Sequence, residues 1–319
     1  MPSSRIKSQR LLVARGGALG DFLLTLPAIR ALRDALPDTQ INILANKSIG
    51  SLVPEAVEIN SIRWLDDPGL APVFIREGNL AEEWREYFRR HDLVVSYLHD
   101  PEKVFEVNVR SFGVARFVAG PSKIATAGPH AAVQLAQPVR ELGISITDFA
   151  PRLQIGDRAR ADARQKLGAS PVIALHPGSG SARKNWPMAN WVALTEYLIE
   201  RTVPITIIGG EADCGQIAEL QNRFENEQIS FVTDWPLPDL AALLARLIFI
   251  GHDSGVSHLA AATGAASLLL FGPTDPQIWA PQNKNARVLS SPNGDLEQLP
   301  FATVRDVVSQ ELMRIGIRT

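Results

Sequence analysis

The chain has 319 residues, 45% of them hydrophobic and 21% charged, and its 32 Lys and Arg nearly balance its 34 Asp and Glu. This length and composition predict about two ordinary globular domains and exclude both one small domain and a disordered chain. A formal net charge of −2 gives no global positive field, so nucleic acid is not expected as a partner. The one local basic excess is near the N-terminus, at Arg5, Lys7, Arg10 and Arg15.

The single cysteine, Cys214, excludes an intrachain disulfide and a cysteine-based zinc site. It is typical of a reducing compartment, so we expect a cytoplasmic protein. The apolar run at 11–14 is far shorter than the ~7–15 residues of a signal peptide, and no run approaches the ~18 of a membrane span. Any membrane contact is therefore expected to be peripheral, at the inner face of the membrane.

The first half alternates short apolar runs with stretches of helical periodicity. Helices are expected at 21–36, where Pro37 ends the helix, and at 80–90. Strands are expected at 11–14, 41–45, 62–65, 93–97 and 116–119. The second half repeats the pattern, with strands expected at 172–175, 205–208, 229–232, 247–250 and 267–271 and helices at 190–201, 214–226, 237–245, 254–263 and 304–315.

Strands that alternate with helices indicate parallel sheets covered on both faces. The predicted fold class is thus α/β, with two doubly wound domains at 1–155 and 156–319 and a join near 150–169. The terminal helix is also a candidate to pack back on the first domain.

In open α/β sheets ligands bind beyond the carboxyl ends of the strands, so the loops there are the first places to look for chemistry. The loop after the first strand contains Gly17 and Gly20, which permit close approach of another molecule, and then Asp21. An Asp at a helix start is usually a cap, but a carboxylate in a cleft is also able to act as a general base. Both interpretations of Asp21 stay open at this point.

Two further loops in the second half carry phosphate-binding chemistry. The loop 176–187 combines glycines with Ser179, Ser181 and Lys184, and hydroxyls, backbone N–H groups and an ammonium are what a phosphate needs. A polar surface loop explains the same residues about equally well, and no Walker motif is present. The loop 251–258 opens a helix at Asp253 and Ser254, where free N–H groups form an anion site. His258, one turn inside that helix, is by itself more typical of a structural histidine.

Two loops are weaker candidates. Glu211, just past a strand, either accepts hydrogen bonds from ribose hydroxyls or simply opens a helix. Thr274 and Asp275 lie in a proline-bounded turn after a later strand and are candidates for the same cleft.

Together and in this order, the loops resemble glycosyltransferase family 9, the ADP-heptose:lipopolysaccharide heptosyltransferases. The resemblance rests on Gly20-Asp21 with Pro27, His176-Pro177-Gly178 followed by Lys184-Asn185-Trp186-Pro187, Gly209-Gly210-Glu211, Asp253-Ser254-Gly255-Val256-Ser257-His258 and Phe271-Gly272-Pro273-Thr274-Asp275-Pro276. It implies the GT-B fold, two Rossmann-like domains facing across a cleft, with the acceptor on the first and the nucleotide sugar on the second.

The resemblance also implies a role for each matched residue. Asp21 would be the general base, Arg15 with Gly17 and Gly20 would meet an anionic acceptor, and Lys184 would bind a donor phosphate. The remaining donor contacts would be Ser179, Ser181, Glu211, Asp253, Ser254, Gly255, Val256, Ser257 and His258.

The implied function is inverting transfer of a heptose or related sugar, from ADP-heptose or a similar nucleotide diphosphate sugar, to a lipopolysaccharide core or other glycan acceptor. No D-x-D triplet occurs in the sequence, so neither a metal nor a cofactor is expected. A nucleotide-sugar epimerase or hydrolase on the same scaffold is one alternative. A non-catalytic nucleotide-binding protein is another, although it would need no carboxylate at Asp21.

Overall fold

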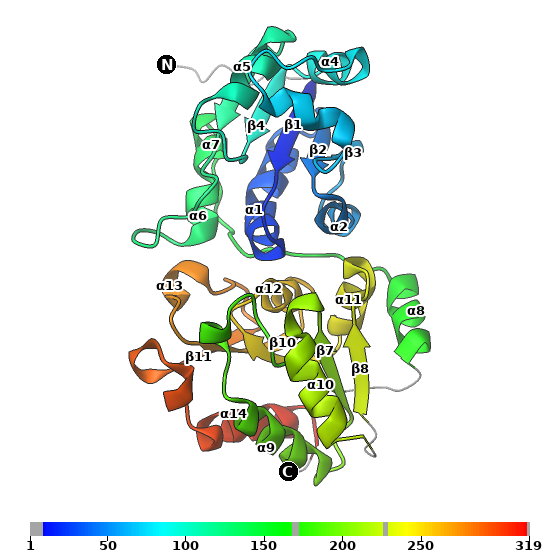
Figure 1. The fold of residues 1–319 in the computed structure, drawn as a ribbon, viewed down its shortest axis with the longest axis vertical. Helices are drawn as coiled ribbons and strands as arrows, with labels where there is room; N and C mark the ends of the chain where they lie inside the picture. Colours follow the sequence, from blue (N-terminus) through cyan, green and yellow to red (C-terminus); the bar gives the residue numbers. More distant parts are fainter. Residues whose placement is uncertain (1–8, 168–171, 226–228, 318–319) are drawn as a thin grey trace. The chain divides into compact units, whose positions relative to one another are not determined.

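The computed structural model describes residues 9–167, 172–225 and 229–317, and the chain divides into two compact units, Met1–Phe149 and Ala150–Thr319 (Figure 1). Arg5 and Lys7 of the basic segment lie outside the described residues. No helix in the described ranges is long and apolar enough to cross a membrane.

In its described residues, unit 1 contains a five-stranded sheet in the order β3-β2-β1-β4-β5, with all neighbours parallel. The strands are β1 (Arg10–Arg15), β2 (Gln40–Ala45), β3 (Ser61–Trp64), β4 (Leu93–Ser96) and β5 (Arg116–Ala119). The helices are α1 (Leu19–Ala35), α2 (Lys47–Gly50), α3 (Val53–Ala56), α4 (Glu82–Arg89), α5 (Val104–Ser111), α6 (Ala131–Leu135) and α7 (Gln137–Glu141).

Unit 2 contains a six-stranded parallel sheet, again in its described residues, in the order β11-β10-β9-β6-β7-β8. Its strands are β6 (Ile173–His176), β7 (Ile205–Gly209), β8 (Ile229–Thr233), β9 (Ile248–His252), β10 (Ala266–Phe271) and β11 (Ala286–Ser290). Its helices are α8 (Asp157–Leu167), α9 (Met188–Ile199), α10 (Cys214–Arg223), α11 (Leu237–Leu244), α12 (Gly255–Ala262), α13 (Pro276–Trp279) and α14 (Phe301–Arg314). Counted from β6, this is the 3-2-1-4-5-6 order of dinucleotide-binding folds.

Side chains that alternate between the two faces of each strand form the main core of unit 2. Every second residue of four neighbouring strands belongs to one buried cluster: Ile173 and Leu175, Ile205 and Ile207, Ile248 and Ile250, Leu268 and Leu270. Buried residues of α9, α10 and α14 cover this face of the sheet. Burying the apolar stripes of these helices is the main force that holds them there.

The terminal helix α14 lies in unit 2, where it packs on α9 (Figure 1). Its residues Val304, Val307, Val308 and Leu312 are part of the unit 2 core. The apolar stripe of α14 thus continues the core that α9 and α10 have begun.

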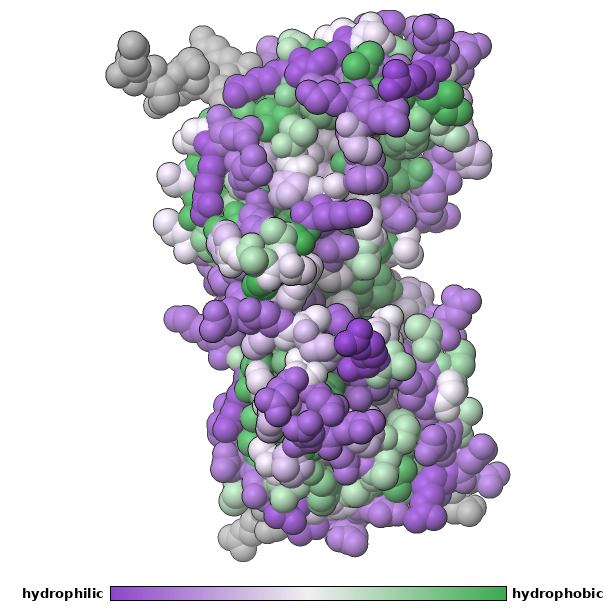
Figure 2. Space-filling view, turned by 60° about the vertical axis from the view of Figure 1, so that its left-hand side comes forward, coloured by the Kyte–Doolittle hydropathy of each residue, from purple (hydrophilic) through white to green (hydrophobic). Residues whose placement is uncertain are grey.

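On the face shown in Figure 2, hydrophilic side chains predominate and hydrophobic ones are scattered among them. Scattered apolar residues of this kind are normal on a protein surface.

Candidate functional site

The strand order of unit 2 reverses between β6 and β9, which pair directly, for example Leu175 with Ile250. The loops 177–187 and 253–258 leave the carboxyl ends of these two strands and so begin side by side. Such a reversal point is where open α/β sheets bind ligands. Two of the predicted donor loops therefore meet at the place that the topology favours.

Lys184 and Asp253 join these two loops. Lys184 ends the 3₁₀ turn Ala182–Lys184, and its Nζ donates to Asp253 Oδ2 over 2.7 Å. Thr274 Oγ1, from the turn after β10, donates to the same oxygen over 2.8 Å. The Asp253 side chain is 8% exposed and that of Lys184 29%, so the ammonium lies at the rim of the site. A cation in this position is able to meet a ligand anion.

The helix α12 begins beside this ion pair. Ser254 caps it, because Ser254 Oγ accepts the Ser257 N–H over 3.3 Å. Gly255 and Val256 form the first turn and are half-buried, and N–H groups in a first helical turn lack intrahelical acceptors and favour anions. Ser257 and His258 are buried, and the Ser257 hydroxyl donates to the backbone oxygen of His252.

The two serines of the Lys184 loop differ in their surroundings. Ser179 is buried, and its Oγ donates to the Ser181 backbone oxygen over 2.8 Å. Ser181 is exposed. The Ser179 hydroxyl thus shapes the loop from inside, whereas Ser181 is the serine that faces solvent.

His252, the last residue of β9, lies beneath the same loop and was not a predicted site residue. It is fully buried; its Nε2 accepts the Trp186 N–H over 2.8 Å, and its Nδ1 donates to the Gly178 oxygen over 3.1 Å. Because Nε2 is the acceptor, the proton of the neutral ring lies on Nδ1. Burial lowers the pKa of His252 to about 3, so the ring stays neutral at physiological pH. A histidine between a strand and a glycine-rich loop gives no sequence signal that separates this role from ordinary packing.

A second buried histidine supports the Glu211 loop. Asp213 Oδ2 lies 3.2 Å from His176 Nε2 and accepts the Gly210 N–H over 3.0 Å. Burial alone would raise the pKa of Asp213, but hydrogen bonds from His176 and the Gly210 N–H, together with the nearby imidazoles of His176 and His252, leave that pKa below its ordinary value. Glu211 itself is exposed in the 3₁₀ turn Glu211–Asp213, just past β7. Its carboxylate is open to a ligand beside the neighbouring strand β6.

In unit 1 the strand order reverses between β1 and β4, and Arg15 ends β1. Only 3% of the Arg15 side chain is exposed; Nη1 donates to the Tyr97 oxygen over 3.4 Å, and Nη2 lies 3.7 Å from Asp21 Oδ1. Burial lowers the pKa of Arg15, and the Asp21 charge opposes that shift. Arg15, expected to meet an acceptor, is therefore enclosed beside Asp21.

Asp21 is the third residue of α1 and holds the preceding turn. Its Oδ2 accepts the Ala18 N–H over 3.2 Å, while 35% of its side chain remains exposed. Gly17 has φ 94°, and a Cβ there would lie 2.9 Å from Asp21 Oδ2, so this close approach requires glycine. Gly20, within the helix, is half-buried. The carboxylate thus makes a local capping contact and is still reachable from solvent.

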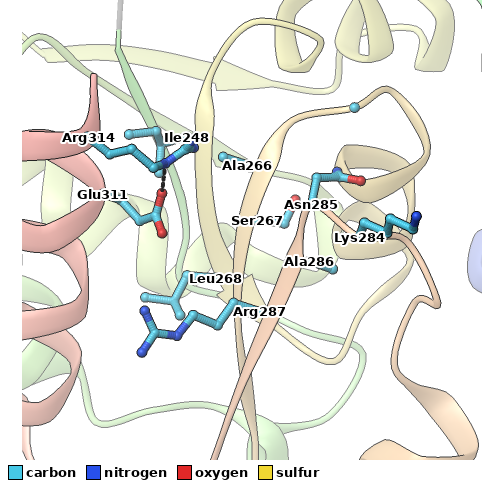
Figure 3. A pocket seen from close by; sticks show the side chains of 11 residues that line it. Ile248, Ala266, Ser267, Leu268, Lys284, Asn285, Ala286, Arg287, Glu311 and Arg314 are labelled. Atoms are coloured by element: carbon cyan, nitrogen blue, oxygen red, sulfur yellow. Dashed lines mark hydrogen bonds and ion pairs between the residues drawn. The ribbon is translucent and has the colours of Figure 1, made fainter. Parts of the chain in front are cut away.

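A pocket of about 460 Å³ lies at the opposite edge of the unit 2 sheet (Figure 3). Its lining comes from the amino ends of β9, β10 and β11 and the end of α14, where Arg314 Nε donates to Glu311 Oε2 over 2.8 Å. Asn285 Nδ2 donates to the Ala265 oxygen over 2.6 Å. None of the predicted site residues lines it.

Comparisons with known proteins identify the family of the chain. The sequence pattern of "Glycosyltransferase family 9 (heptosyltransferase)" matches residues 123–302, more than half of the chain. Lipopolysaccharide heptosyltransferase 1 of Pseudomonas aeruginosa is 26% identical over 301 residues, covering 84% of this chain and 79% of that protein. Lipopolysaccharide heptosyltransferase 1 of Salmonella typhimurium is 23% identical over 321 residues, covering 92% of this chain and 98% of that protein.

Solved structures share the fold. The family 9 glycosyl transferase of Veillonella parvula has a TM-score of 0.80 at 18% identity and covers 98% of this chain and 99% of its own. The ADP-heptose lps heptosyltransferase II of Escherichia coli has a TM-score of 0.79 at 19% identity and covers 96% of this chain and 99% of its own. The predicted α/β fold of GT-B type is confirmed. The chain belongs to glycosyltransferase family 9, the heptosyltransferase family, and is a glycosyltransferase.

Proposed function

We propose that the chain transfers a heptose from ADP-heptose to a lipopolysaccharide core acceptor, with inversion at the anomeric carbon and without a metal ion. The observation that carries the proposal is the meeting of Lys184, Asp253 and Thr274 beside the start of α12, at the reversal point of unit 2. An E. coli heptosyltransferase in the same fold was solved with ADP-2-deoxy-2-fluoro heptose, which supports the choice of donor.

In this proposal unit 2 binds the donor and unit 1 binds the acceptor. Lys184, the first-turn N–H groups at Gly255 and Val256 and the Ser181 hydroxyl hold the diphosphate, Glu211 accepts from the ribose hydroxyls, and Asp253 faces the sugar. Gly17 and Gly20 let the acceptor approach Asp21. Contact with a membrane that carries the acceptor would be peripheral.

The reaction needs one proton transfer and one displacement. The Asp21 carboxylate takes the proton of the acceptor hydroxyl, and the acceptor oxygen attacks the anomeric carbon from the face opposite the diphosphate. The bond between that carbon and the diphosphate oxygen breaks, and its electron pair leaves with the diphosphate. Lys184 and the α12 N–H groups stabilise the charge that develops there. Arg15, buried behind Asp21, keeps a positive charge next to the carboxylate.

The proposal is tested with purified protein, a heptose-free core acceptor, and ADP-heptose beside UDP- and GDP-sugars. We expect mass spectrometry to detect one added heptose with ADP-heptose and to detect little product with the other donors. Nuclear magnetic resonance of the product should show the inverted anomeric configuration. Release of free heptose or of a new epimer without acceptor would instead identify a hydrolase or an epimerase.

Metal independence is a separate expectation. Because an ammonium and helix N–H groups are available to the diphosphate, transfer should continue at an unchanged rate in excess EDTA. The measurement is initial rate with EDTA, with added Mg²⁺, and with neither. A rate that falls in EDTA and returns with Mg²⁺ contradicts the expectation.

A further inference from the structure

The loop that presents Lys184 makes two of its backbone hydrogen bonds to one imidazole. The Gly178 oxygen and the Trp186 N–H, near the two ends of the loop, bond the Nδ1 and Nε2 atoms of His252 over 3.1 and 2.8 Å. Lys184 lies between these two anchors. The ring therefore sets both the width of the loop and the position of its cation.

The same end of β9 also contacts Lys184 from outside the loop. Asp253 follows His252 directly, and its Oδ2 accepts the Lys184 ammonium over 2.7 Å. The Ser257 hydroxyl donates to the His252 backbone oxygen, which ties the start of α12 to the same residue. The end of β9, at His252 and Asp253, thus holds both Lys184 and the first turn of α12.

The ring itself is held firmly. His252 is fully buried, and its ring centroid lies 5.3 Å from that of Trp191, edge to face at 88°. Trp191 belongs to α9 in the unit 2 core. A ring fixed by a core tryptophan, and with both nitrogens engaged by one loop, has little freedom to turn.

We propose that His252 is a positioning residue for the donor: it holds the loop 178–186 so that Lys184 is placed for the diphosphate before the donor arrives. The inference rests on the proposed function, because it takes Lys184 as a phosphate ligand. His252 touches no substrate and acts through the loop.

Three variants separate the two bonds. His252→Gln has a side-chain oxygen near the Nε2 position and keeps an acceptor for Trp186, and His252→Asn has an amide near Nδ1 and keeps a donor for Gly178. His252→Ala loses both bonds. Loss of one hydrogen bond changes an equilibrium constant by about 5-fold. We therefore expect the ADP Kd to rise roughly 5-fold in His252→Gln and in His252→Asn, and at least about 10-fold in His252→Ala. The acceptor KM should stay at its wild-type value.

A control variant separates positioning from loss of stability. Val308→Ala weakens the same core from α14, far along the chain from the loop, and is expected to lower the melting temperature without changing the ADP Kd. Hydrogen exchange without ligand gives a readout that is independent of the donor. The amides of 178–186 should exchange faster in His252→Ala and at the wild-type rate in Val308→Ala.

A double-mutant cycle tests whether His252 acts through Lys184. On a Lys184→Ala background, His252→Ala should change the ADP Kd by less than half as much, on a logarithmic scale, as in the wild type. Equal effects on both backgrounds, or a wild-type ADP Kd in folded His252→Ala, would overturn the inference while leaving the proposed function intact. A wild-type protein that neither binds ADP nor uses ADP-heptose would overturn both.

Discussion

Asp21 combines a structural contact and a chemical group in one side chain, and the two roles respond differently to substitution. Its Oδ2 accepts the Ala18 N–H, which an amide oxygen also does, but an amide does not take a proton from a hydroxyl. The first prediction uses this difference. Asp21→Asn should keep the melting temperature and the ADP affinity while turnover falls at least ~100-fold, the low end of the range for losing a general base.

Thermal unfolding, ADP calorimetry and initial rates measure these three quantities. Asp67 supplies the matched control, because its side chain caps a 3₁₀ turn of the same unit by accepting the Gly69 N–H over 2.7 Å. Asp67→Asn should leave all three quantities unchanged. Wild-type turnover by Asp21→Asn would show that the carboxylate only caps the turn.

The second prediction concerns Lys184. Its removal takes away the proposed charge-assisted hydrogen bond to the donor, worth about 1.5–3 kcal/mol, and leaves the Asp253 carboxylate without the cation that now pairs with it. Lys184→Ala should therefore weaken ADP binding by roughly 10- to 150-fold in calorimetry. Arg183, the exposed cation next to it in the same turn, provides the control, and Arg183→Ala should bind ADP as the wild type does. Equal losses in both variants would point to the general charge of the loop instead.

Some residues of the candidate site are readable from the sequence and others are not. The loops of Lys184 and Asp253 could be singled out because each follows a buried strand and combines glycines with hydroxyls. The enclosure of Arg15 and the hydrogen bonds of His252 to the Lys184 loop could not be predicted. Both depend on which side chains the sheet brings next to them, and residue order along the chain does not contain that information.

At the scale of elements, the loop after β6 has a second constraint, in Gly178. A Cβ at Gly178 would lie 1.7 Å from Asp213 Oδ1, so the backbone passes directly over that carboxylate. A Cβ at Gly180, two residues further along the same loop, would meet no atom of the described residues within 4 Å outside its immediate chain neighbours. The two glycines therefore form a matched pair.

The third prediction follows from this pair. Gly178→Ala forces the loop away from Asp213 at a cost of about 1–3 kcal/mol, so both the melting temperature and the ADP affinity should fall. Gly180→Ala should change the free energy of unfolding by no more than about 0.5 kcal/mol. Differential scanning calorimetry with and without ADP measures both effects. Similar behaviour of the two variants would mean that the Gly178 backbone is free to shift.

The predicted strands are all present. The central ones are apolar runs buried on both faces of a parallel sheet, whereas the edge strands β3 and β8 are mostly half-buried. β11 was not predicted. It is an edge strand whose residues are only half-buried or exposed, and Arg287 interrupts its apolar character. The short helices α6 and α7 also escaped prediction, since five residues each are too few to establish a helical period.

At the scale of the whole molecule, the two units carry separate cores, and the proposed donor contacts all belong to one of them. The fourth prediction is that ADP slows hydrogen exchange in the loops 177–187, 209–213 and 252–258 and leaves the strands of unit 1 unchanged. Mass spectrometry of peptides with and without ADP measures this. Protection confined to residues 15–21 would place the nucleotide on unit 1 and contradict the division of roles.

The strand order also bears on how the protein folds. In each sheet the strands at the reversal point are far apart in sequence: Leu11 of β1 pairs with Leu93 of β4, and Leu175 of β6 with Ile250 of β9. Pairing over such separations closes a long loop and is intrinsically slow. The loops of Lys184 and Asp253 meet only after β6 has paired with β9, so a half-folded unit 2 lacks the proposed nucleotide site. We therefore expect a nucleotide to bind only fully folded molecules in a refolding mixture and to slow their unfolding. The folding steps that precede the pairing of β6 with β9 should keep their rates.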